Sequence, residues 1–374
     1  MKCSNILILG GTGAMGKPLV DILAEKKDAH ICVTTRSKRE NKGNIKYIVG
    51  NARDDEFMKH ILKSNDWDVI IDFMAYSTKE FERRYESFLE NCKQYVFISS
   101  CRVYAKSDAP ITEKTDRLLD VCKDAAYLNT DEYALSKARQ ENLLFESEKK
   151  NFTIIRPSIT YNSHRLQLGV LEKEHWLYRA MHGRTIVFSK DIADKLTAMT
   201  TGYDVALAIA NVIGEETALG EVFHITSPNS YKWSDVLKIY IDVLEECTGK
   251  KQKVLFTEKS TCFNVGWNMY QIIYCRYFNR TFDNSKISEY YDARKFQELR
   301  SGIRQCLSEF LSNPHFGNIM WDLEAVNDKV CKEWTPLREI HEKKNKVIYL
   351  CYRLGISSLY RLGLKVWNQM KKHI

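Results

Sequence analysis

Short apolar runs alternate with amphipathic stretches over the first 155 residues of this chain, and this alternation limits the fold more than any other feature. The apolar runs predict strands at residues 5–9, 30–34, 45–49, 68–71, 95–98 and 153–155, and the stretches between them predict helices, for example at 14–26, 57–63, 81–91 and 131–148. Strands that alternate with helices form βαβ units with parallel strands. The sequence therefore predicts an α/β fold with a Rossmann-like, doubly wound parallel sheet.

The pattern changes after residue 156. Helices are predicted at 171–182, 203–213 and 233–247, with a strand at 221–226. We expect residues 1–156 to form the sheet domain. Residues 157–313 are expected to form mainly a smaller α/β cap that closes a substrate cleft, with some segments returning to the sheet half. Asn313 and Pro314 mark a break, after which residues 314–374 are predicted to form a helical, basic C-terminal extension.

Gly10, Gly13 and Gly16 lie between the first predicted strand and the first predicted helix, in the string LGGTGAMG. Glycines at this place let the backbone turn tightly and approach a pyrophosphate, which the N–H groups of the helix N-terminus bind. Glycine-rich turns also occur only to pack a helix on a strand, but the strand before and the helix after favour a dinucleotide site. We therefore expect residues 1–156 to bind NAD or NADP.

The end of the second predicted strand distinguishes these two dinucleotides. A site for NAD usually has an acidic residue there, which accepts hydrogen bonds from the ribose hydroxyls. This chain reads TTRSKR at that place, with no acid before Glu40. Arg36 and Ser37 are suited to a 2′-phosphate, so we expect NADP, with NAD as the alternative. The competing interpretation is that these cations form a solvated loop.

Tyr133 and Lys137 lie four residues apart in the string YALSK, and a helix would place both on one face. A Lys ammonium beside a phenol, together with the positive nicotinamide ring, lowers the pKa of the tyrosine. Tyr133 would then be suited to general acid/base catalysis. The same spacing is common on exposed helix faces, so its position matters. The upstream string VFISSCRVY places Ser99 and Ser100 at a strand end, where an open α/β sheet binds its ligand.

These strings resemble the extended short-chain dehydrogenase/reductases of the NAD-dependent epimerase/dehydratase family. The similar strings are GGTGAMG, DFMAY, ISSCRVY, YALSKARQE and IIRPS, followed by GYDVALAI, GEVFHITS and FDNSKI, in the family's order over residues 3–313. The resemblance implies that Ser100 hydrogen-bonds the reacting oxygen, that Tyr133 transfers the proton and that Lys137 binds the nicotinamide ribose. It also places further residues in the cofactor groove beside the glycines, Arg36 and Ser37: Thr12, Met15, Asn51, Ala75, Ser99 and Pro157.

Two departures from the family narrow the expected reaction. The 4,6-dehydratase branch follows its catalytic Thr with acidic residues that eliminate water, whereas Cys101 and Arg102 follow Ser100 here. Dehydration is therefore disfavoured. Many members carry an Asn after the sixth strand that helps to hold the sugar nucleotide, and this chain has Ile159 in that place. We therefore expect an altered grip on the substrate.

The resemblance implies an NAD(P)-dependent epimerase or reductase/dehydrogenase that acts by hydride transfer on a sugar carbinol of a nucleotide sugar, in surface polysaccharide or sugar-nucleotide biosynthesis. Epimerisation and net oxidation or reduction use the same residues, so the sequence leaves both open. We expect a homodimer. The alternatives are a non-catalytic, NADP-sensing or RNA-binding relative of the same fold, and a membrane-docked scaffold whose working part is the tail.

Phosphate groups of such a substrate need cations. The candidate substrate-binding residues are His164 and Arg165, after the sixth predicted strand, and Arg276 and Arg280, before the string DNSK. Each is equally typical of a surface cation. The histidines and the eleven cysteines show no spacing typical of metal ligands, so no metal site is expected.

The formal charge of +8 comes from the end of the chain. Eight bases and no acid follow Glu342, so residues 1–342 are neutral overall, and nucleic acid is not an expected partner. From Ile356 onward, apolar residues such as Trp367 recur at helical spacing opposite basic ones. This pattern suits peripheral contact of residues 343–374 with an anionic membrane, or docking of a terminal helix on the protein itself.

The N-terminal apolar run is too short for the core of a signal peptide. No other run approaches the roughly 18 to 20 apolar residues that span a bilayer. We therefore expect a cytoplasmic protein with reduced thiols, which would be membrane-associated if its basic tail binds lipid.

Overall fold

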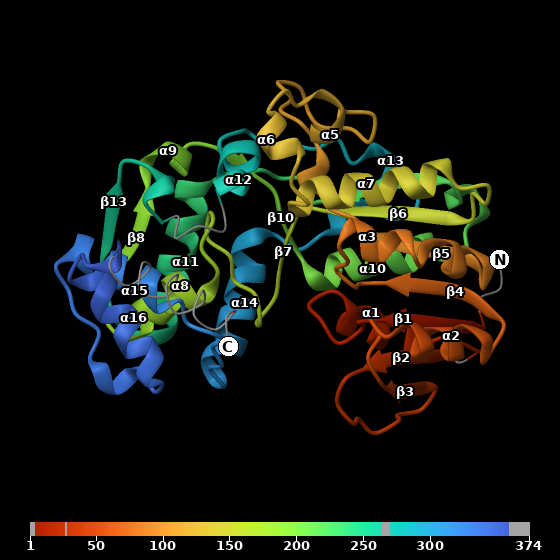
Figure 1. The fold of residues 1–374 in the computed structure, drawn as a ribbon, viewed down its shortest axis with the longest axis horizontal. Helices are drawn as coiled ribbons and strands as arrows, with labels where there is room; N and C mark the ends of the chain where they lie inside the picture. The colour runs from red at the N-terminus through yellow and green to blue at the C-terminus, as the bar shows by residue number, and fades with distance from the viewer. Residues whose placement is uncertain (1–3, 27, 264–268, 359–374) are drawn as a thin grey trace, which may run out of the picture. The chain divides into compact units, whose positions relative to one another are not determined.

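The structure is a computed structural model that describes residues 4–26, 28–263 and 269–358 (Figure 1). The chain divides into two compact units, each built from three stretches of sequence. Unit 1 consists of the chain up to Arg165, Leu196–Tyr231 and Phe278–Cys306. Unit 2 consists of Leu166–Lys195, Lys232–Tyr277 and the chain from Leu307 onward. The assignment of residues 1–156 and 157–313 to cofactor and substrate binding stays a prediction.

Unit 1 contains a seven-stranded parallel sheet with the order β11-β6-β5-β4-β1-β2-β3 (Figure 1). Its strands are β1 (Asn5–Leu9), β2 (His30–Thr35), β3 (Ile45–Val49), β4 (Trp67–Asp72), β5 (Cys92–Ile98), β6 (Phe152–Pro157) and β11 (Glu221–Ile225). The predicted Rossmann-like, doubly wound sheet is confirmed, and the strand expected at 221–226 returns to it as β11. The strand order reverses between β1 and β4, the place where ligands bind to such sheets.

Helices cover both faces of this sheet, which explains why its central strands are continuous apolar runs. Side chains of β1 alternate between two buried clusters. Ile6 and Ile8 pack with α1 (Gly16–Ala24) and α10 (Gly202–Val212) on one face. Leu7 and Leu9 belong to the cluster on the other face, where α2 (Asp55–Lys63), α4 (Tyr85–Glu90) and α7 (Tyr133–Glu146) lie.

The helix expected at 81–91 is two helices, α3 (Thr78–Glu82) and α4. A capping box between Ser77 and Glu80 starts α3 three residues earlier than the apolar pattern indicated. Arg84 separates the two helices, because its backbone leaves helical geometry at φ −126°. Its buried guanidinium donates to the carbonyl of Ala52 at 3.2 Å, a contact far away in the sequence.

Unit 2 combines helices with a small sheet. β8 (Ile186–Ser189) and β13 (Val254–Thr257) pair in parallel, and α8 (Lys173–Met181) and α11 (Trp233–Thr248) supply large buried side chains. The Trp176 ring of α8 lies 4.6 Å from the Tyr240 ring of α11, centroid to centroid. Pairs of large aromatic rings of this kind bury much apolar area in a small unit.

The C-terminal extension is helical, with α15 (Trp321–Cys331) and α16 (Lys343–Arg353), and both helices pack within unit 2. Arg179 of α8 is fully buried and forms 2.9 Å ion pairs with three carboxylates: Glu324, Asp328 and Glu333. The Tyr349 hydroxyl of α16 donates to Asp328 at 2.7 Å. The chain through α16 is therefore part of the fold of unit 2. Residues 359–374, which carry most of the predicted amphipathic tail, lie outside the described residues.

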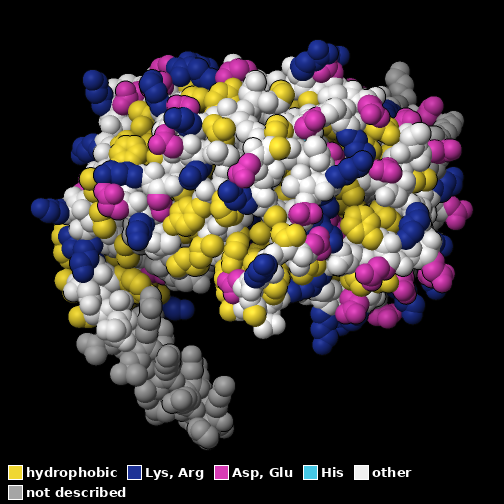
Figure 2. Space-filling view, turned by 90° about the horizontal axis from the view of Figure 1, so that it is seen from above, with side chains coloured by type: hydrophobic (Ala, Val, Ile, Leu, Met, Phe, Trp, Pro, Cys, Tyr) yellow, Lys and Arg dark blue, Asp and Glu magenta, His cyan; other side chains and the backbone are white. Residues whose placement is uncertain are grey.

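The other elements are mostly short. They are α5 (Leu118–Val121), α6 (Ala125–Leu128), β7 (Ile159–Tyr161), α9 (Lys190–Ala193), β9 (Leu196–Thr197), β10 (Met199–Thr201), β12 (Tyr231–Lys232), α12 (Met269–Gln271), α13 (Ser285–Ser288) and α14 (Leu299–Ser312). β7 pairs with β10, and β9 pairs with β12. Within the described ranges, no helix combines the length and apolarity that a membrane crossing requires. Acidic and basic side chains are interspersed over the face seen in Figure 2.

Candidate active site

The loop between β1 and α1 has the backbone that its glycines predict. Gly10 adopts a φ of +70°, which residues with a side chain rarely adopt. A Cβ at Gly16 would lie 2.7 Å from backbone atoms of the same loop, so only glycine fits where α1 begins. Thr12 and Gly13 are exposed, and Met15, the N-cap residue of α1, makes no side-chain cap. This arrangement leaves the N-terminus of α1 suited to an anion.

Gly202, which the sequence argument did not single out, also shapes this loop. It is the first residue of α10, and a Cβ there would lie 2.2 Å from the carbonyl oxygen of Ala14. Thr160 contacts the loop as well, because its hydroxyl lies 3.7 Å from the sulfur of Met15. The string GYDVALAI contained the signal for Gly202, since the glycine stands directly at the expected helix start.

Arg36 and Ser37, which are expected to bind a 2′-phosphate, follow β2, and Asn51, which is expected to line the cofactor groove, follows β3. Arg36 and Ser37 are exposed directly after β2, and Thr35 fixes this turn by accepting from the Ser37 N–H at 3.3 Å and donating to its carbonyl at 3.0 Å. Asn51 is exposed after β3, and its side-chain oxygen accepts from the Arg53 N–H at 3.1 Å. All three lie at the carboxyl edge of the sheet.

The remaining predicted groove residues also follow strands of this sheet. Ala75 is exposed after β4, and its carbonyl accepts from Arg53. Pro157 ends β6 and is buried. The buried Ser99 hydroxyl donates to Glu141 at 2.6 Å, so this side chain is held by the protein itself. The open loop, the uncapped helix end and the exposed residues along this edge together fit a dinucleotide.

Ser100 and Tyr133 meet at the same edge. Ser100 follows β5, and its hydroxyl accepts from the Arg102 N–H at 3.2 Å, which begins a short 3₁₀ turn. Tyr133 is the first residue of α7 and is 42% exposed. Ser100 lies close enough to the phenol for its hydroxyl to be among the groups that lower the pKa of Tyr133. The structure thus brings together the two side chains that the sequence analysis expected to act on the reacting oxygen.

The sequence predicts that Lys137 lowers the pKa of Tyr133. In the structure, other groups have the main influence on this pKa. Burial of the phenol oxygen raises the pKa of Tyr133, and Arg102, Arg165 and the Ser100 hydroxyl oppose this rise. Although the residue as a whole is partly exposed, the surroundings of this oxygen decide the pKa, because the phenolate charge lies there. Lys137 is not among the main opposing cations, since its ammonium points deeper into the unit.

Lys137 lies one helical turn after Tyr133 and is only 3% exposed. Its Nζ atom lies 4.4 Å from the centroid of the Phe97 ring, on β5. Burial lowers the pKa of Lys137 to about 8, and the negative charges of Asp72 and Glu141 oppose that shift. With both carboxylates beside it the lysine is still mostly protonated at pH 7, and without them its pKa would be lower still.

Glu132, directly before Tyr133, is a functional candidate that the sequence analysis missed. Its carboxylate accepts from the Ala134 N–H at 2.8 Å and so caps α7, and it also accepts from the Tyr127 hydroxyl at 3.1 Å. It forms an ion pair with Arg102 as well. Arg102 lies 5.4 Å from the centroid of the Tyr133 ring. An acid beside the start of the helix was the available signal in the sequence.

A buried ion pair anchors α7 behind these residues. Arg156 of β6 binds Glu141 through two hydrogen bonds of 2.8 and 2.6 Å. Arg117 contacts the same carboxylate at 3.2 Å. Glu141 is fully buried, and a carboxylate in that setting requires such partners. The network ties α7 to β5 through Ser99 and to β6 through Arg156, and it thereby fixes the position of Tyr133 and Lys137.

The four predicted substrate cations fall into two groups. His164 and Arg165 are exposed in a turn after β7, closed by two backbone hydrogen bonds between Asn162 and Arg165 at 3.0 Å. Arg276 is buried in unit 2 and donates to the Gly169 carbonyl at 2.9 Å. Arg280 is buried in unit 1 and donates to the carbonyls of Tyr104 and Ala105 at 3.1 and 3.0 Å. The last two therefore have packing roles, and substrate contact by all four stays a prediction.

Known proteins are similar to this chain in sequence. The model of the NAD dependent epimerase/dehydratase family matches residues 6–192. The chain is 27% identical over 237 residues to the chloroplast stem-loop binding protein of 41 kDa b of Arabidopsis thaliana, a match that covers 59% of this chain and 58% of that protein. It is 35% identical over 77 residues to the UDP-glucose 4-epimerase of Streptococcus mutans, which covers 19% of this chain and 23% of that enzyme. The chain thus spans less than two thirds of either relative.

Solved structures share the fold. The UDP-glucuronic acid 4-epimerase of Bacillus cereus in complex with NAD superposes with a TM-score of 0.63 at 16% identity, over 85% of this chain and 99% of that one. The dTDP-glucose 4,6-dehydratase of Bacillus anthracis in complex with NAD gives a TM-score of 0.62 at 17% identity, over 83% and 97%. At such identities the likeness concerns the fold alone.

Proposed function

The chain belongs to the NAD dependent epimerase/dehydratase family, and on that premise we propose that it is an NAD(P)-dependent epimerase or reductase/dehydrogenase that acts on a sugar carbinol of a nucleotide sugar. The observation that carries this proposal is the placement of Ser100, directly after β5, and of Tyr133, at the start of α7, at the carboxyl edge of the sheet, close enough for Ser100 to lower the pKa of the phenol. The same edge carries the glycine loop and Lys137. A proton-transferring phenol beside a dinucleotide site is what such a reaction requires.

Tyr133 takes the hydroxyl proton of the substrate in this proposal, and Ser100 holds the reacting oxygen by a hydrogen bond. The positive charges of Arg102 and Arg165 stabilise the phenolate, because both oppose the rise of the Tyr133 pKa. Lys137 binds the nicotinamide ribose. The nicotinamide, when bound, supplies the hydride acceptor for the carbinol carbon. Return of the hydride to the opposite face is epimerisation, and a one-way transfer is net oxidation or reduction.

We propose NADP as the preferred dinucleotide, with NAD as the alternative. The glycine loop and the N-terminus of α1 would bind the pyrophosphate. Arg36 and Ser37 would bind a 2′-phosphate, because both are exposed after β2 and no acid stands in their place. The two solved structures named above contain NAD, and this is a property of those two proteins.

Dehydration remains disfavoured in this proposal. The position that follows Cys101 is Arg102, and the nearby carboxylate of Glu132 is engaged by Arg102, by Tyr127 and by the start of α7. A carboxyl group committed to three partners is poorly suited to protonate a leaving hydroxyl. We therefore place the chain with the epimerases and oxidoreductases, in surface polysaccharide or sugar-nucleotide biosynthesis.

The protein is further proposed to be a cytoplasmic homodimer with peripheral membrane contact through residues 343–374. Because α16 contributes the buried Tyr349 to unit 2, the lipid-binding part would begin after it. Removal of residues 359–374 tests this, with α16 left intact. We expect loss of binding to vesicles that contain anionic lipid and unchanged soluble activity. Equal vesicle binding by the shortened protein would contradict the proposal.

The catalytic proposal is tested by Tyr133→Phe in the full chain. Nucleotide sugars are screened with NADP and with NAD, by reduced-nicotinamide absorbance and by product stereochemistry. We expect turnover to fall by a factor of about 10² to 10⁴, the usual contribution of a general acid/base, with dinucleotide affinity unchanged. Tyr203→Phe is a matched control, because Tyr203 is another exposed tyrosine near a helix start. Unchanged turnover in Tyr133→Phe would refute the assignment.

A second candidate is a stem-loop RNA-binding protein of the same fold, which the match to the chloroplast protein favours. The even charge balance of residues 1–342 weighs against it, because RNA binding draws most of its affinity from phosphate contacts. Titration of a stem-loop RNA at several salt concentrations decides between the two. A salt-dependent affinity that Tyr133→Phe leaves unchanged, without turnover of any nucleotide sugar, would favour this candidate.

A further inference from the structure

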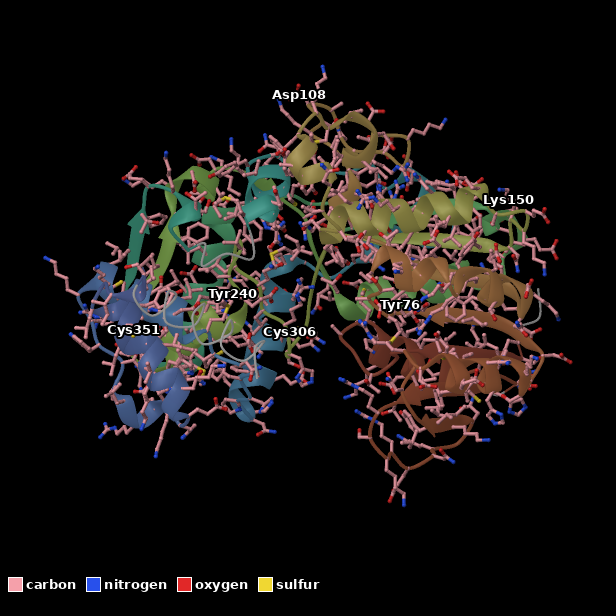
Figure 3. All side chains as sticks on the ribbon, viewed as in Figure 1. Tyr76, Asp108, Lys150, Tyr240, Cys306 and Cys351 are labelled. Carbon is pink, nitrogen blue, oxygen red and sulfur yellow. The ribbon has the colours of Figure 1, made fainter. Side chains whose placement is uncertain are left out.

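Asp72 is a buried carboxylate that the proposed reaction does not use. It ends β4 and is fully buried. The Tyr95 hydroxyl donates to one of its oxygens at 2.8 Å, and the Met74 N–H donates to the other at 2.8 Å. Tyr76, labelled in Figure 3, follows in the same loop, and its hydroxyl is among the groups that lower the pKa of Asp72. These partners are neutral, so they hold the carboxylate without balancing its charge.

Lys137 lies beside this carboxylate. The register of the sheet pairs Asp72 on β4 with Phe97 on β5, so their side chains leave the same face as neighbours. The Lys137 ammonium lies over the Phe97 ring at 4.4 Å. Asp72 and Lys137 therefore share one buried corner of unit 1, and each acts electrostatically on the other.

The other carboxylate that acts on Lys137 is Glu141, one turn further along α7. Two guanidinium groups already bind Glu141, from Arg156 and Arg117. Its negative charge is thus largely balanced. The guanidinium of Arg84 lies 5.4 Å from the centroid of the Tyr76 ring and is not among the groups that chiefly act on Asp72. Asp72 is consequently the carboxylate best placed to support the lysine's charge.

We infer that Asp72 is a positioning residue that keeps the ammonium of Lys137 charged, and so sets the pH range in which Lys137 serves Tyr133 and the cofactor. The statement about catalysis rests on the proposed function. The electrostatic influence of Asp72 on Lys137 does not. A buried lysine without such a partner loses its proton readily, because desolvation disfavours the charged form.

The directions of the pKa shifts of both groups agree with this arrangement. Burial raises the pKa of Asp72 to about 6, while the hydrogen bonds from Met74 and Tyr95 and the charge of Lys137 oppose the rise. Burial lowers the pKa of Lys137 to about 8. Between these values both groups are charged. Below about pH 6 the carboxyl takes up a proton, and its support of the lysine is lost, although the lysine then keeps its proton in any case.

The first experiment follows the lysine itself. The full chain is labelled with ¹³C at lysine Cε, the Lys137 signal is assigned by its absence in Lys137→Arg, and its titration is recorded by NMR. Asp72→Asn should lower the pKa of Lys137 by about one unit or more, the usual effect of removing an opposite charge nearby. Asp68→Asn is the matched control, because Asp68 lies on the same strand and pairs with Lys93. An unchanged Lys137 titration in Asp72→Asn would overturn the inference.

The second experiment measures kcat/KM against pH. The alkaline limb of Asp72→Asn should move to lower pH by the same amount, and Asp72→Glu should restore part of the shift. A uniform loss at every pH would indicate a merely structural role and overturn the inference. If no nucleotide sugar is turned over, the proposed function fails, while the NMR titration still decides on Asp72.

Tyr95→Phe gives a second variant that keeps the carboxylate in case Asp72→Asn does not fold. Without the Tyr95 hydroxyl the pKa of Asp72 should rise, because a donor to the ionised form is lost. Asp72 is then charged, and supports the lysine, over a narrower pH range. The pKa of Lys137 should therefore fall, as in Asp72→Asn, but by a smaller amount. A shift in the opposite direction would contradict the inference.

Discussion

The guanidinium of Arg102 lies 5.4 Å from the centroid of the Tyr133 ring, and its ion pair with Glu132 holds it there. Glu132 in turn caps the helix that begins with Tyr133. Arg102 thus contributes a positive charge beside the phenol, and Glu132 holds it there. This charge opposes the rise of the Tyr133 pKa that burial causes.

Replacing Arg102 by Gln should therefore raise the pKa of Tyr133 further. We expect the rising limb of kcat/KM against pH to move to higher pH by about one unit, because a nearby cation that favours the phenolate is lost. Arg102→Lys keeps the charge and should shift the limb less. An unchanged limb in Arg102→Gln would show that this cation has no influence on the reacting group.

Replacing Glu141 by Ala should strongly destabilise the protein. It leaves the buried Arg156 without its partner, and removing one member of a buried ion pair costs about 3–5 kcal/mol. Urea denaturation measures the loss. Asp120→Asn removes the exposed partner of Arg117 and should cost less than about 1 kcal/mol. Similar losses in both variants would argue against the anchoring role of Glu141.

Arg36→Gln tests the preference for NADP. If Arg36 binds the 2′-phosphate, the Kd for NADP should rise by about ten- to a hundredfold, as expected for a charged hydrogen bond worth roughly 1.5–3 kcal/mol. The Kd for NAD should not change. Titration calorimetry measures both, and Lys38→Gln is the control in the same exposed loop. An equal effect on the two dinucleotides would refute the assignment.

Tyr349→Phe tests whether the extension stabilises unit 2. The buried Tyr349 hydroxyl donates to Asp328 at 2.7 Å and accepts from the Thr335 N–H at 2.8 Å. Its removal should cost about 1.5–3 kcal/mol of unfolding free energy, because one of these bonds involves a charged group. Unfolding by guanidinium chloride, followed by tryptophan fluorescence, measures the change. A loss no larger than that of the exposed Tyr203→Phe would contradict this role.

Stability should also fall in mild acid. Burial lowers the pKa of His175, so the folded chain resists the proton that the unfolded chain takes up below about pH 6.5. The stabilising contribution is present above that pH and is lost as the pH falls, by at most about 1.4 kcal/mol per pH unit for one group. Unfolding free energies measured from pH 7.5 to 5 should show a smaller slope in His175→Gln. The exposed His30→Gln should keep the original slope.

The parts of the fold that depend on local periodicity were predictable. The strands of the sheet and the glycine loop can be read from short strings, because buried parallel strands are continuous apolar runs and the turn after β1 requires glycine. The division of α3 from α4 was not predictable. It depends on Arg84 reaching the carbonyl of Ala52, about 30 residues away, and no local pattern records that contact.

The candidate site was predictable in its residue types and less so in its electrostatics. The four-residue spacing of Tyr133 and Lys137 predicts that both side chains lie on one face of a helix. Because α7 begins at Tyr133, the tyrosine lies in the exposed first turn and the lysine lies one turn deeper, over Phe97. Sequence alone also could not separate the exposed Arg165 from the buried Arg276 and Arg280, since burial is decided by residues far away in the chain.

The ion pair between Arg179 and Glu333 joins residues 154 positions apart, and this has a consequence for biosynthesis. On the ribosome, the strands β1 to β6 emerge in one continuous stretch. Helix α8 emerges long before the carboxylates that form ion pairs with its Arg179. Until α15 and Glu333 are synthesised, the guanidinium of Arg179 lacks its carboxylate partners, and the core around α8 cannot form. We therefore expect unit 2 to finish folding late in translation, and to need protection by chaperones more than unit 1 until then.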